Sequence, residues 1–403
     1  MHLDWELLAG GYCGRREYGL NPDIPFETRL DGTLLSFFVF SFAFIARPIG
    51  TVVFMEIQRR WGRATKLTLA LFALGSSTVG IAFLPGYGAL GYMAIVLLAF
   101  FRIGQGVALG GSWDGLPSLL ALSAPPNRRG WYAMMGQLGA PVGFMLASGL
   151  YLLLYATLSQ EDFLSWGWRY PFFCAFAINV VALFARLRLV VTHEYDQLLT
   201  EKELEPNRAG ELLVSQGYNV ILGAFGALAS YALFHVVTVF PLSWILLFSK
   251  QSVTGFLAIQ ILAAILGIGG VLASGVIADR IGRRKTLGLF ATLIAVFSGF
   301  APTLLDGGTL GQDVFVLVGF TLLGLSYGQA AGALNASFDP RYRYTGAALT
   351  SDVAWLIGAG FAPLVALGLS AYFGLAYVSL YLLSGAAGTL AALWVNRKLE
   401  ESD

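Results

Sequence analysis

The sequence predicts an all-α polytopic membrane protein made of two pseudo-repeated helical bundles. Three observations predict this class: the composition, the spacing of the apolar runs, and the distribution of Lys and Arg between those runs. Of the 403 residues, 57% are hydrophobic and 12% are charged, whereas soluble globular domains carry about 25% charged residues. The net charge of +1 says nothing about nucleic acid, and the sequence has no basic tail. We therefore expect a lipid bilayer, and no nucleic acid, among the partners.

The apolar runs give the number of spans, because a helix needs about 20 apolar residues to cross a bilayer. By this measure the sequence holds about eleven runs. They lie at residues 34–54, 67–84, 89–112, 131–155, 170–191, 218–248, 254–278, 286–305, 314–334, 346–369 and 372–395.

A polar stretch, "VTHEYDQLLTEKELEPNRAGELL", separates the first five runs from the last six. We expect it to be a surface linker, in which a short amphipathic helix could lie on the membrane. The sequence then divides into a polar N-terminal segment without a span, an N-terminal bundle, the linker, a C-terminal bundle and a tail. Their expected ranges are 1–32, 33–191, 192–216, 217–396 and 397–403.

The loops between the runs are alternately rich and poor in Lys and Arg. "EIQRRWGRATK" and "ADRIGRRK" hold four each, "LPGYG" and "LDGGTLGQD" hold none, and no poor loop holds more than one. The positive-inside rule places the rich loops in the cytoplasm. The sequence therefore predicts a multi-pass protein of the plasma (inner) membrane with a cytoplasmic C-terminus.

Two pairs of loops indicate an internal repeat. "RRWGR", beginning at Arg59, matches "DRIGR", beginning at Asp279, at an offset of 220 residues. The Pro-containing turns "PPNRRGW" and "DPRYRYTG" lead through Gly130 and Gly346, respectively, into Gly-rich spans. Parallel repeats of this kind are one of the common plans for secondary transporters, with the substrate site near the midplane between the halves.

Several motifs resemble a known family. "GVIADRIGRRK", beginning at Gly275, resembles the loop signature of the major facilitator superfamily, and "RIGQG", beginning at Arg102, resembles its fourth-helix motif. "RPIG", "GQGVALGG", "RRG" and "RYTGAAL" resemble the metabolite:proton symporter branch. The resemblance covers about residues 33 to 395. It implies a twelve-span plan in which two bundles rock around a central site, and a monomer as the working unit.

The chain departs from this plan at its beginning, where the first span is missing or altered. Two interpretations stay open: a true eleven-span variant, or a truncated or garbled start. The first-half loop departs as well, since Met55 and Arg59 stand where the signature has Gly and Asp. Glu56 is the candidate replacement for that acid.

The resemblance implies a cytoplasmic gate made by the two signature loops. Asp279 would meet the amino end of a helix in the other half, the span that starts near Trp131, and the helix dipole would hold it there. The expected gate residues are Glu56, Arg60, Gly62, Arg63, Gly275, Asp279, Arg280, Gly282, Arg283 and Arg284.

Ionisable and polar residues inside spans are candidates for the substrate and proton pathway, because burying them in a bilayer is costly. The candidates are Arg102, Gln105, Asp114, His235 and Asp352. Arg102 would bind an anion or tune a carboxylate, or else bridge helices structurally, and Gln105 lies one turn further on the same face.

The other candidates also have two interpretations each. Asp114 would replace a displaced carboxylate or cap a helix end. Asp352 would carry a proton or be stabilised by the first turns of its helix. His235 would couple protons or be hydrogen-bonded and inert. Arg47, in "ARPIG", is expected to reach the interface or to pair near the cytoplasmic side.

These observations predict a secondary active transporter for a small metabolite, with an organic anion as the expected substrate because of Arg102. Proton symport is expected, because no G-x-x-x-x-G-K-[ST] loop for ATP occurs. A proton-coupled drug or metabolite exporter and a degenerate, non-transporting membrane protein are the alternatives. Three scattered histidines and two unpaired cysteines suggest no enzyme, cofactor or metal site.

Overall fold

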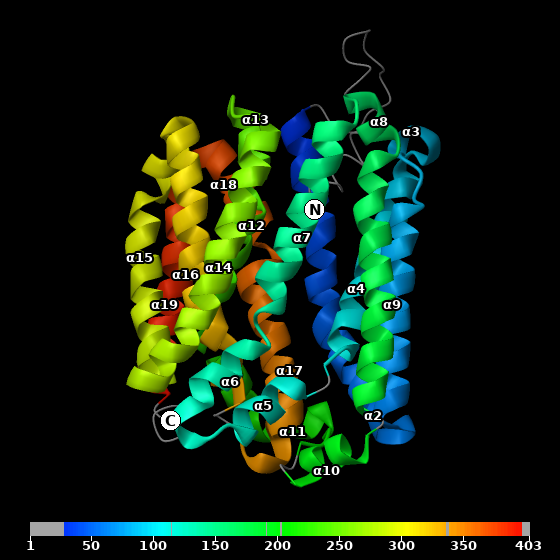
Figure 1. The fold of residues 1–403 in the computed structure, drawn as a ribbon, viewed down its shortest axis with the longest axis vertical. Helices are drawn as coiled ribbons and strands as arrows, with labels where there is room; N and C mark the ends of the chain where they lie inside the picture. Colours follow the sequence, from blue (N-terminus) through cyan, green and yellow to red (C-terminus); the bar gives the residue numbers. More distant parts are fainter. Residues whose placement is uncertain (1–27, 114, 191, 202–203, 336–337, 397–403) are drawn as a thin grey trace.

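The computed structural model describes residues 28–113, 115–190, 192–201, 204–335 and 338–396. Every regular element within these ranges is a helix. Figure 1 shows long helices that run side by side along the longest axis of the molecule, with short helices and loops at the two ends. An all-α polytopic membrane protein, as predicted from the composition and the apolar runs, is confirmed.

The helices that precede the polar linker are called here the first-half helices, and those that follow it the second-half helices. The first half contains α2 (Arg29–Ala82), α3 (Tyr87–Leu90), α4 (Tyr92–Gly111), α5 (Leu116–Ser123), η2 (Pro126–Arg128), α6 (Arg129–Met135), α7 (Gly139–Thr157), α8 (Gln160–Ser165), η3 (Gly167–Arg169) and α9 (Tyr170–Val190). Within the linker lies α10 (His193–Glu201).

The second half contains α11 (Ala209–Gly226), α12 (Leu228–Thr238), α13 (Phe240–Phe248), α14 (Val253–Ile281), α15 (Arg283–Asp306), α16 (Gly308–Asn335), η4 (Pro340–Tyr342), α17 (Arg343–Ala354), the π-helix η5 (Trp355–Gly360), α18 (Ala362–Phe373) and α19 (Ala376–Val395). In Figure 1, α2, α4 and α9 gather on one side and α15, α16 and α19 on the other.

The first helix, α2, holds two spans. It begins with a capping box, in which Thr28 and Asp31 satisfy each other's backbone N–H groups. Its 54 residues would be about 81 Å long as a straight helix, far more than a bilayer core of about 30 Å. At Gly62 the backbone leaves the helical region and the chain reverses. Within the described residues, ten helical segments are long and apolar enough to span a membrane, and α2 is counted among them once. Since α2 divides into two spans at Gly62, the total is the expected eleven.

The reversals at Gly62 and Gly282 confirm the internal repeat in backbone geometry. Gly62 has φ 83° and ψ 169°, and Gly282 has φ 85° and ψ 150°. Both values lie in a region that glycine adopts without strain and that side chains with a Cβ avoid. Each glycine sits between two consecutive spans, 220 residues apart. The matched glycines of the two signature loops are therefore the hinges of two equivalent helical hairpins.

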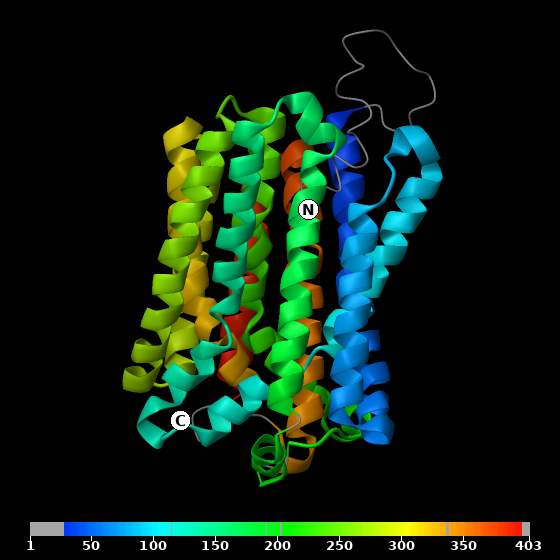
Figure 2. The same ribbon diagram turned by 45° about the vertical axis from the view of Figure 1, so that its right-hand side comes forward.

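The Lys- and Arg-rich loops lie at one end of the molecule, which we call the basic end. It contains the Gly62 and Gly282 reversals together with η2, η4 and α10, and it is at the bottom of Figures 1 and 2. The opposite end contains α3, α8 and the end of α13. The expected alternation of the loops between two ends is present.

One expected boundary is wrong. The linker was expected to extend to residue 216, but α11 begins at Ala209. Its first turn carries Glu211, which lies 3.3 Å from Arg341 of η4. Just before the helix, the backbone N–H of Asn207 donates to Thr345 of α17 at 2.9 Å. These tertiary contacts hold the beginning of the helix ahead of the apolar run. The amphipathic helix expected within the linker is present as α10.

Glycines set how closely α2 and α4 pack. A Cβ added at Gly106 would overlap the backbone carbonyl of Ala43, and one at Gly110 would overlap that of Arg47. Likewise, a Cβ at Gly50 would overlap the backbone of Val107. Small residues at such crossings let helix backbones approach closely in membranes. This contact between "RPIG" and "GQGVALGG" brings Arg47 on α2 and Arg102 on α4 to the same cavity.

Candidate functional site

A small cavity of about 180 Å³ lies between α2 and α4. Two guanidinium groups line it, Arg47 from α2 and Arg102 from α4, with Gln105 beside them. The rest of the lining is apolar or aromatic: Phe40, Ala43, Phe44, Leu74 and Leu109. Two arginines on one largely apolar cavity form a site suited to an anion, because arginine stays protonated and its planar fork matches a carboxylate.

Arg102 is held in place from several directions. Its side chain is buried, and its Nη1 donates to Gln105 Oε1 at 2.9 Å. Gln105 in turn donates to Thr78 Oγ1 at 2.9 Å. The Arg102 guanidinium lies 5.6 Å from the ring centroid of Phe40. The structure thus brings Arg102 and Gln105 together as expected, and Thr78 orients the amide.

Asp352 pairs with Arg47 across the two halves. The Arg47 Nε lies 2.6 Å from Asp352 Oδ1, with side-chain exposures of 18% and 4%. Thr51, one turn further along α2, donates its hydroxyl to Oδ2 of the same carboxylate. The Arg47 guanidinium also lies 5.5 Å from the ring centroid of Trp355. Arg47 therefore forms an ion pair, as one of its two interpretations held, and its partner comes from the second half.

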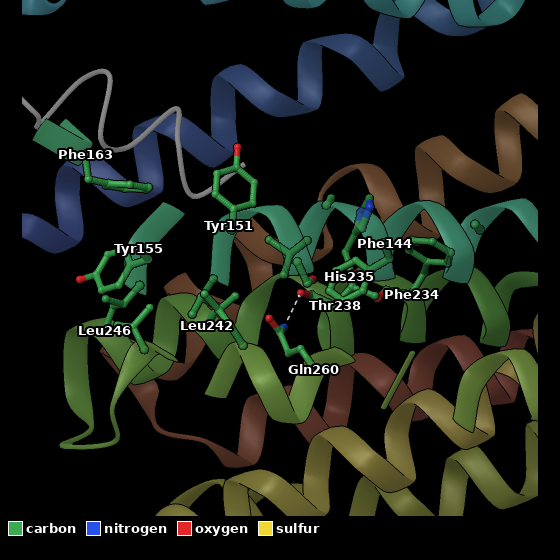
Figure 3. Close-up of a pocket in the computed structure, with 16 residues that line it drawn as sticks. Phe144, Tyr151, Tyr155, Phe163, Phe234, His235, Thr238, Leu242, Leu246 and Gln260 are labelled. Carbon is green, nitrogen blue, oxygen red and sulfur yellow. Dashed lines mark hydrogen bonds between the residues drawn. The ribbon is translucent and has the colours of Figure 1, made fainter. Parts of the chain in front are cut away.

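A larger cavity of about 410 Å³ lies between α7 of the first half and α12, α13 and α14 of the second. Figure 3 shows residues of its lining, among them the aromatic Phe144 and Tyr151 and the polar Thr238 and Gln260. Gln260 Nε2 donates to the Thr238 carbonyl at 3.1 Å. His235 is the one histidine of this lining. Arg102 does not line this cavity.

His235 stands between the two cavities. It lines the larger one, and its ring packs edge-on against Phe40 and Phe44, which line the smaller one. Its Nδ1 lies 2.7 Å from the carbonyl oxygen of Ala359. A carbonyl can only accept, so Nδ1 carries the hydrogen. His235 is therefore hydrogen-bonded, as one of its two interpretations held, and it separates the cavities together with the two phenylalanines.

The π-helix η5 supplies that carbonyl. Such bulges leave backbone groups available and are frequent at functional sites. Ala359 bonds His235, and the neighbouring Gly358 carbonyl accepts from the Tyr381 hydroxyl at 2.7 Å. A Cβ at Gly360 would come within 2.8 Å of Phe44. The π-helix thus fits closely against both α12 and α2 next to the Arg47–Asp352 pair.

The expected contact of Asp279 is present at the basic end. Its Oδ1 accepts from the backbone N–H of Gly130 at 2.7 Å and of Trp131 at 3.3 Å, at the beginning of α6. Gly275 and Gly130 allow this approach, because a Cβ at Gly130 would lie 2.9 Å from the Gly275 carbonyl. Gln329 on α16 donates to the Gly130 carbonyl at 3.2 Å. Three helices from both halves therefore meet at this point.

Glu56 makes only local ion pairs among the contacts described for it. Arg59 and Arg60, on its own helix, each lie 2.6 Å from one of its carboxylate oxygens. The hydrogen bond from Arg60, aided by the nearby charge of Arg59, lowers the pKa of Glu56. The side chain is 42% exposed. Glu56 is therefore not placed as Asp279 is, and the two signature loops are asymmetric.

A buried cluster that sequence reasoning missed joins α2 of the first half to α17 of the second half at the basic end. Lys66 is fully buried, and its Nζ donates to Gln58 Oε1 at 2.9 Å, to the carbonyl of Trp113 and to the Tyr344 hydroxyl at 3.2 Å. Tyr344 belongs to α17 of the second half, and its hydroxyl also lies 3.0 Å from Gln58. In the sequence, Lys66 was one of four loop charges, with no sign that it is buried.

The remaining gate candidates lie at the basic end. Arg283 is buried, Arg280 is exposed, and Arg284 donates through Nη2 to the Leu393 carbonyl at 2.8 Å, near the end of α19. Arg63 begins the second span of α2, directly after Gly62. Asp114 lies outside the described residues. The candidates thus form two groups. Arg102 and Gln105 line the small cavity, Asp352 is paired with Arg47 of its lining, and His235 packs against two of its phenylalanines; the gate residues form the second group at the basic end.

The asymmetry of the two loops leads to a prediction. Asp279→Asn removes the charge that the α6 amino end stabilises, so we expect the initial rate of substrate uptake to fall by up to about 30-fold. Glu56→Gln breaks exposed pairs within one helix, so we expect a change within about twofold. Uptake into vesicles, normalised to the purified transporter, measures both. Equal defects in the two variants would refute the asymmetry.

The comparisons with known proteins agree with one another. Residues 88–363 match the Major Facilitator Superfamily. The chain is 38% identical over 371 residues to the "Inner membrane metabolite transport protein YhjE" of Escherichia coli (strain K12), covering 90% of this chain and 83% of that protein. It is 31% identical over 367 residues to the "Shikimate transporter" of the same organism, covering 88% and 82%.

The fold has a close counterpart among solved structures. The proton:xylose symporter XylE bound to 6-bromo-6-deoxy-D-glucose superposes with a TM-score of 0.71, covering 97% of this chain and 91% of that chain. The sequence identity is 19%, so this likeness concerns the fold alone.

Proposed function

Since the chain belongs to the major facilitator superfamily, we propose that it is a secondary active transporter that moves a small organic anion together with protons. The family and the relatives are transporters. We further propose that it works as a monomer, with the helices at 33–191 and 217–396 as the moving halves.

The observation that carries the anion is the pair of arginines on one cavity. Arg47 and Arg102 face about 180 Å³ of space, and among the described residues around it the acid is Asp352. Two guanidinium groups from two helices thus line one cavity. A carboxylate there would accept charge-assisted hydrogen bonds from them. The relative named a shikimate transporter supports this class, because shikimate is a small cyclic carboxylate.

Alternating access explains the contacts between the halves. The basic end is held by Asp279 on the beginning of α6 and by Lys66 with Tyr344. The larger cavity lies between the halves in front of His235. We propose that the basic end is cytoplasmic and that the structure corresponds to a state closed on that side. Rocking of the halves would break these contacts and open the site to the cytoplasm.

Proton coupling is tested by uptake into proteoliposomes. With labelled shikimate as the probe, an alkaline interior should drive accumulation above equilibrium, and a protonophore should abolish it. Liposomes without protein serve as the control. Uptake that does not respond to the imposed pH gradient would contradict proton symport. Accumulation in everted vesicles upon acidification of the lumen would instead favour the proton-coupled exporter.

A further inference from the structure

The larger cavity has a lining that carries no fixed charge. Its sixteen described lining residues include no Asp, Glu, Lys or Arg. Arg47 and Arg102 line the small cavity instead, and the rings of His235, Phe40 and Phe44 pack together between the two cavities. A charged ligand in the larger cavity would lose its water without gaining an opposite charge from the lining, which is costly. The lining therefore favours an uncharged molecule.

Two buried side chains of this lining have hydrogen-bonding groups to spare. Gln260 of α14 is 1% exposed and donates through Nε2 to the Thr238 carbonyl, but its Oε1 accepts no hydrogen bond within the described ranges. Ser148 of α7 is 5% exposed, and its hydroxyl makes no hydrogen bond with the part of the chain that the structure describes. Because nearly all buried polar groups in proteins have partners, these two are suited to a ligand.

The rest of the lining fits a ring. Figure 3 shows Tyr155 and Leu246 at one end of the lining and His235 and Phe234 at the other, with Gln260 between them. The volume of about 410 Å³ falls in the range of small-molecule sites, which measure about 300–1,000 Å³. Aromatic side chains hold a flat ring by offset or edge-on packing. The lining supplies five Phe and Tyr rings for this: Phe144, Tyr151, Tyr155, Phe163 and Phe234.

We propose that the larger cavity is a second ligand site, which binds an uncharged, ring-bearing alcohol separately from the anion at the small cavity. The ring packs among the aromatic side chains. The hydroxyl of the ligand donates to Gln260 Oε1 and accepts from the Ser148 hydroxyl, which one hydroxyl can do at the same time. This inference goes beyond the proposed function, because the site needs neither an arginine nor a proton.

A ligand bound in this way links the two halves. Ser148 belongs to α7 of the first half and Gln260 to α14 of the second. These helices lie side by side, since a Cβ at Gly267 would come within 3.8 Å of Pro141. A molecule that binds one arrangement of the halves better than another shifts the population toward it. An occupied cavity therefore favours the arrangement in which the basic end is closed, and it slows any rocking of the halves.

The test is equilibrium binding of tritiated 2-naphthalenemethanol, an uncharged ring-bearing alcohol, to the purified full chain in detergent. Ala147→Phe, which places a phenyl ring in the lining, serves as the blank for uptake of the probe by the micelle. We expect a single saturable site in the wild-type protein. Excess 2-naphthylmethylamine, which carries the same ring with a positive charge, should not displace the probe. Excess shikimate should not displace it either, because the carboxylate is drawn to the arginines.

Two variants test the hydrogen bonds. Gln260→Met and Ser148→Ala should each bind the alcohol about 3- to 10-fold more weakly. Both should bind 2-methylnaphthalene, which has the same ring and no hydroxyl, as the wild type does, and a purely structural defect would weaken both probes alike. Ser384→Ala is the matched control, because the Ser384 hydroxyl donates to the Tyr381 carbonyl within α19. It should bind both probes normally.

Displacement of the alcohol by shikimate, or alcohol binding that Gln260→Met and Ala147→Phe leave unchanged, overturns the second site. The link between the halves is tested by uptake of labelled shikimate and rests on the proposed function. The alcohol should lower the maximal rate of uptake without weakening shikimate binding, and an unchanged rate overturns the link. A protein that binds the alcohol but neither binds nor takes up carboxylates contradicts the proposed anion transport and leaves the second site standing.

Discussion

Arg102→Ala should lower carboxylate uptake by about 10- to 150-fold, since hydrogen bonds to charged groups are worth about 1.5–3 kcal/mol each. The guanidinium is buried in the wall of the small cavity and is oriented by Gln105 and Phe40. Alanine would remove the positive charge and leave Gln105 with one partner fewer. Arg102→Lys should recover only part of the activity, because an ammonium cannot reproduce the planar fork.

Arg169→Ala is the matched control for this experiment. Arg169 lies at the opposite end of the molecule, where its Nη1 donates to the Ser165 carbonyl at 3.0 Å. Uptake of labelled shikimate, normalised to the amount of folded protein, should separate the two arginines. Normal carboxylate transport by Arg102→Ala would exclude Arg102 as a substrate ligand. Loss of transport in both variants would show that arginine removal acts through stability.

Gly110→Ala should prevent α2 and α4 from packing as they do, and little folded protein is expected. The added Cβ would overlap the Arg47 carbonyl and the backbone N–H of Thr51. These are backbone atoms, so no side-chain rotation can relieve the overlap, and overpacking in a rigid interior costs about 1–3 kcal/mol or more. Size-exclusion chromatography of the detergent extract, with a thermal unfolding curve, measures the loss.

Gly143→Ala provides the matched control for Gly110→Ala. Gly143 lies in α7, and a Cβ there would meet no atom within 4 Å. The same chemical change should therefore leave the elution profile and the unfolding temperature close to those of the wild type. A folded, fully active Gly110→Ala protein would mean that the two helices can move apart without cost, and that Arg47 is not fixed by this crossing.

Features encoded locally could be predicted from the sequence. Apolar runs gave the spans, the loop charges gave their alternation, and the paired signature loops gave the repeat that the Gly62 and Gly282 backbones confirm. The contact of Asp279 with the beginning of α6 also followed from the motif. In each case a residue type at a fixed spacing limits the backbone or its environment, whatever the rest of the chain does.

Pairings between distant parts of the chain could not be predicted. Arg47 and Asp352 are 305 residues apart, and each has a sound local explanation, an interfacial arginine and an acid in the first turns of a helix. Lys66 likewise reads as a loop charge. Their burial depends on how helices cross, which single residues do not encode. One signal was available: Gly106 and Gly110 are four residues apart on one face of α4, a spacing typical of a close helix crossing.

The Asp279 contact differs from the Lys66 cluster in which substitutions can break it. On the α6 side its donors are main-chain N–H groups, which every residue except proline supplies. Substitution of the Trp131 side chain therefore leaves the hydrogen bond in place, whereas Asp279 must supply the acceptor and Gly130 and Gly275 must keep the close approach. The cluster of Lys66, Gln58 and Tyr344 needs three large side chains that fit one another. The residues of the first-half closure should accordingly change together across homologous genes, while the second-half closure tolerates substitution at Trp131.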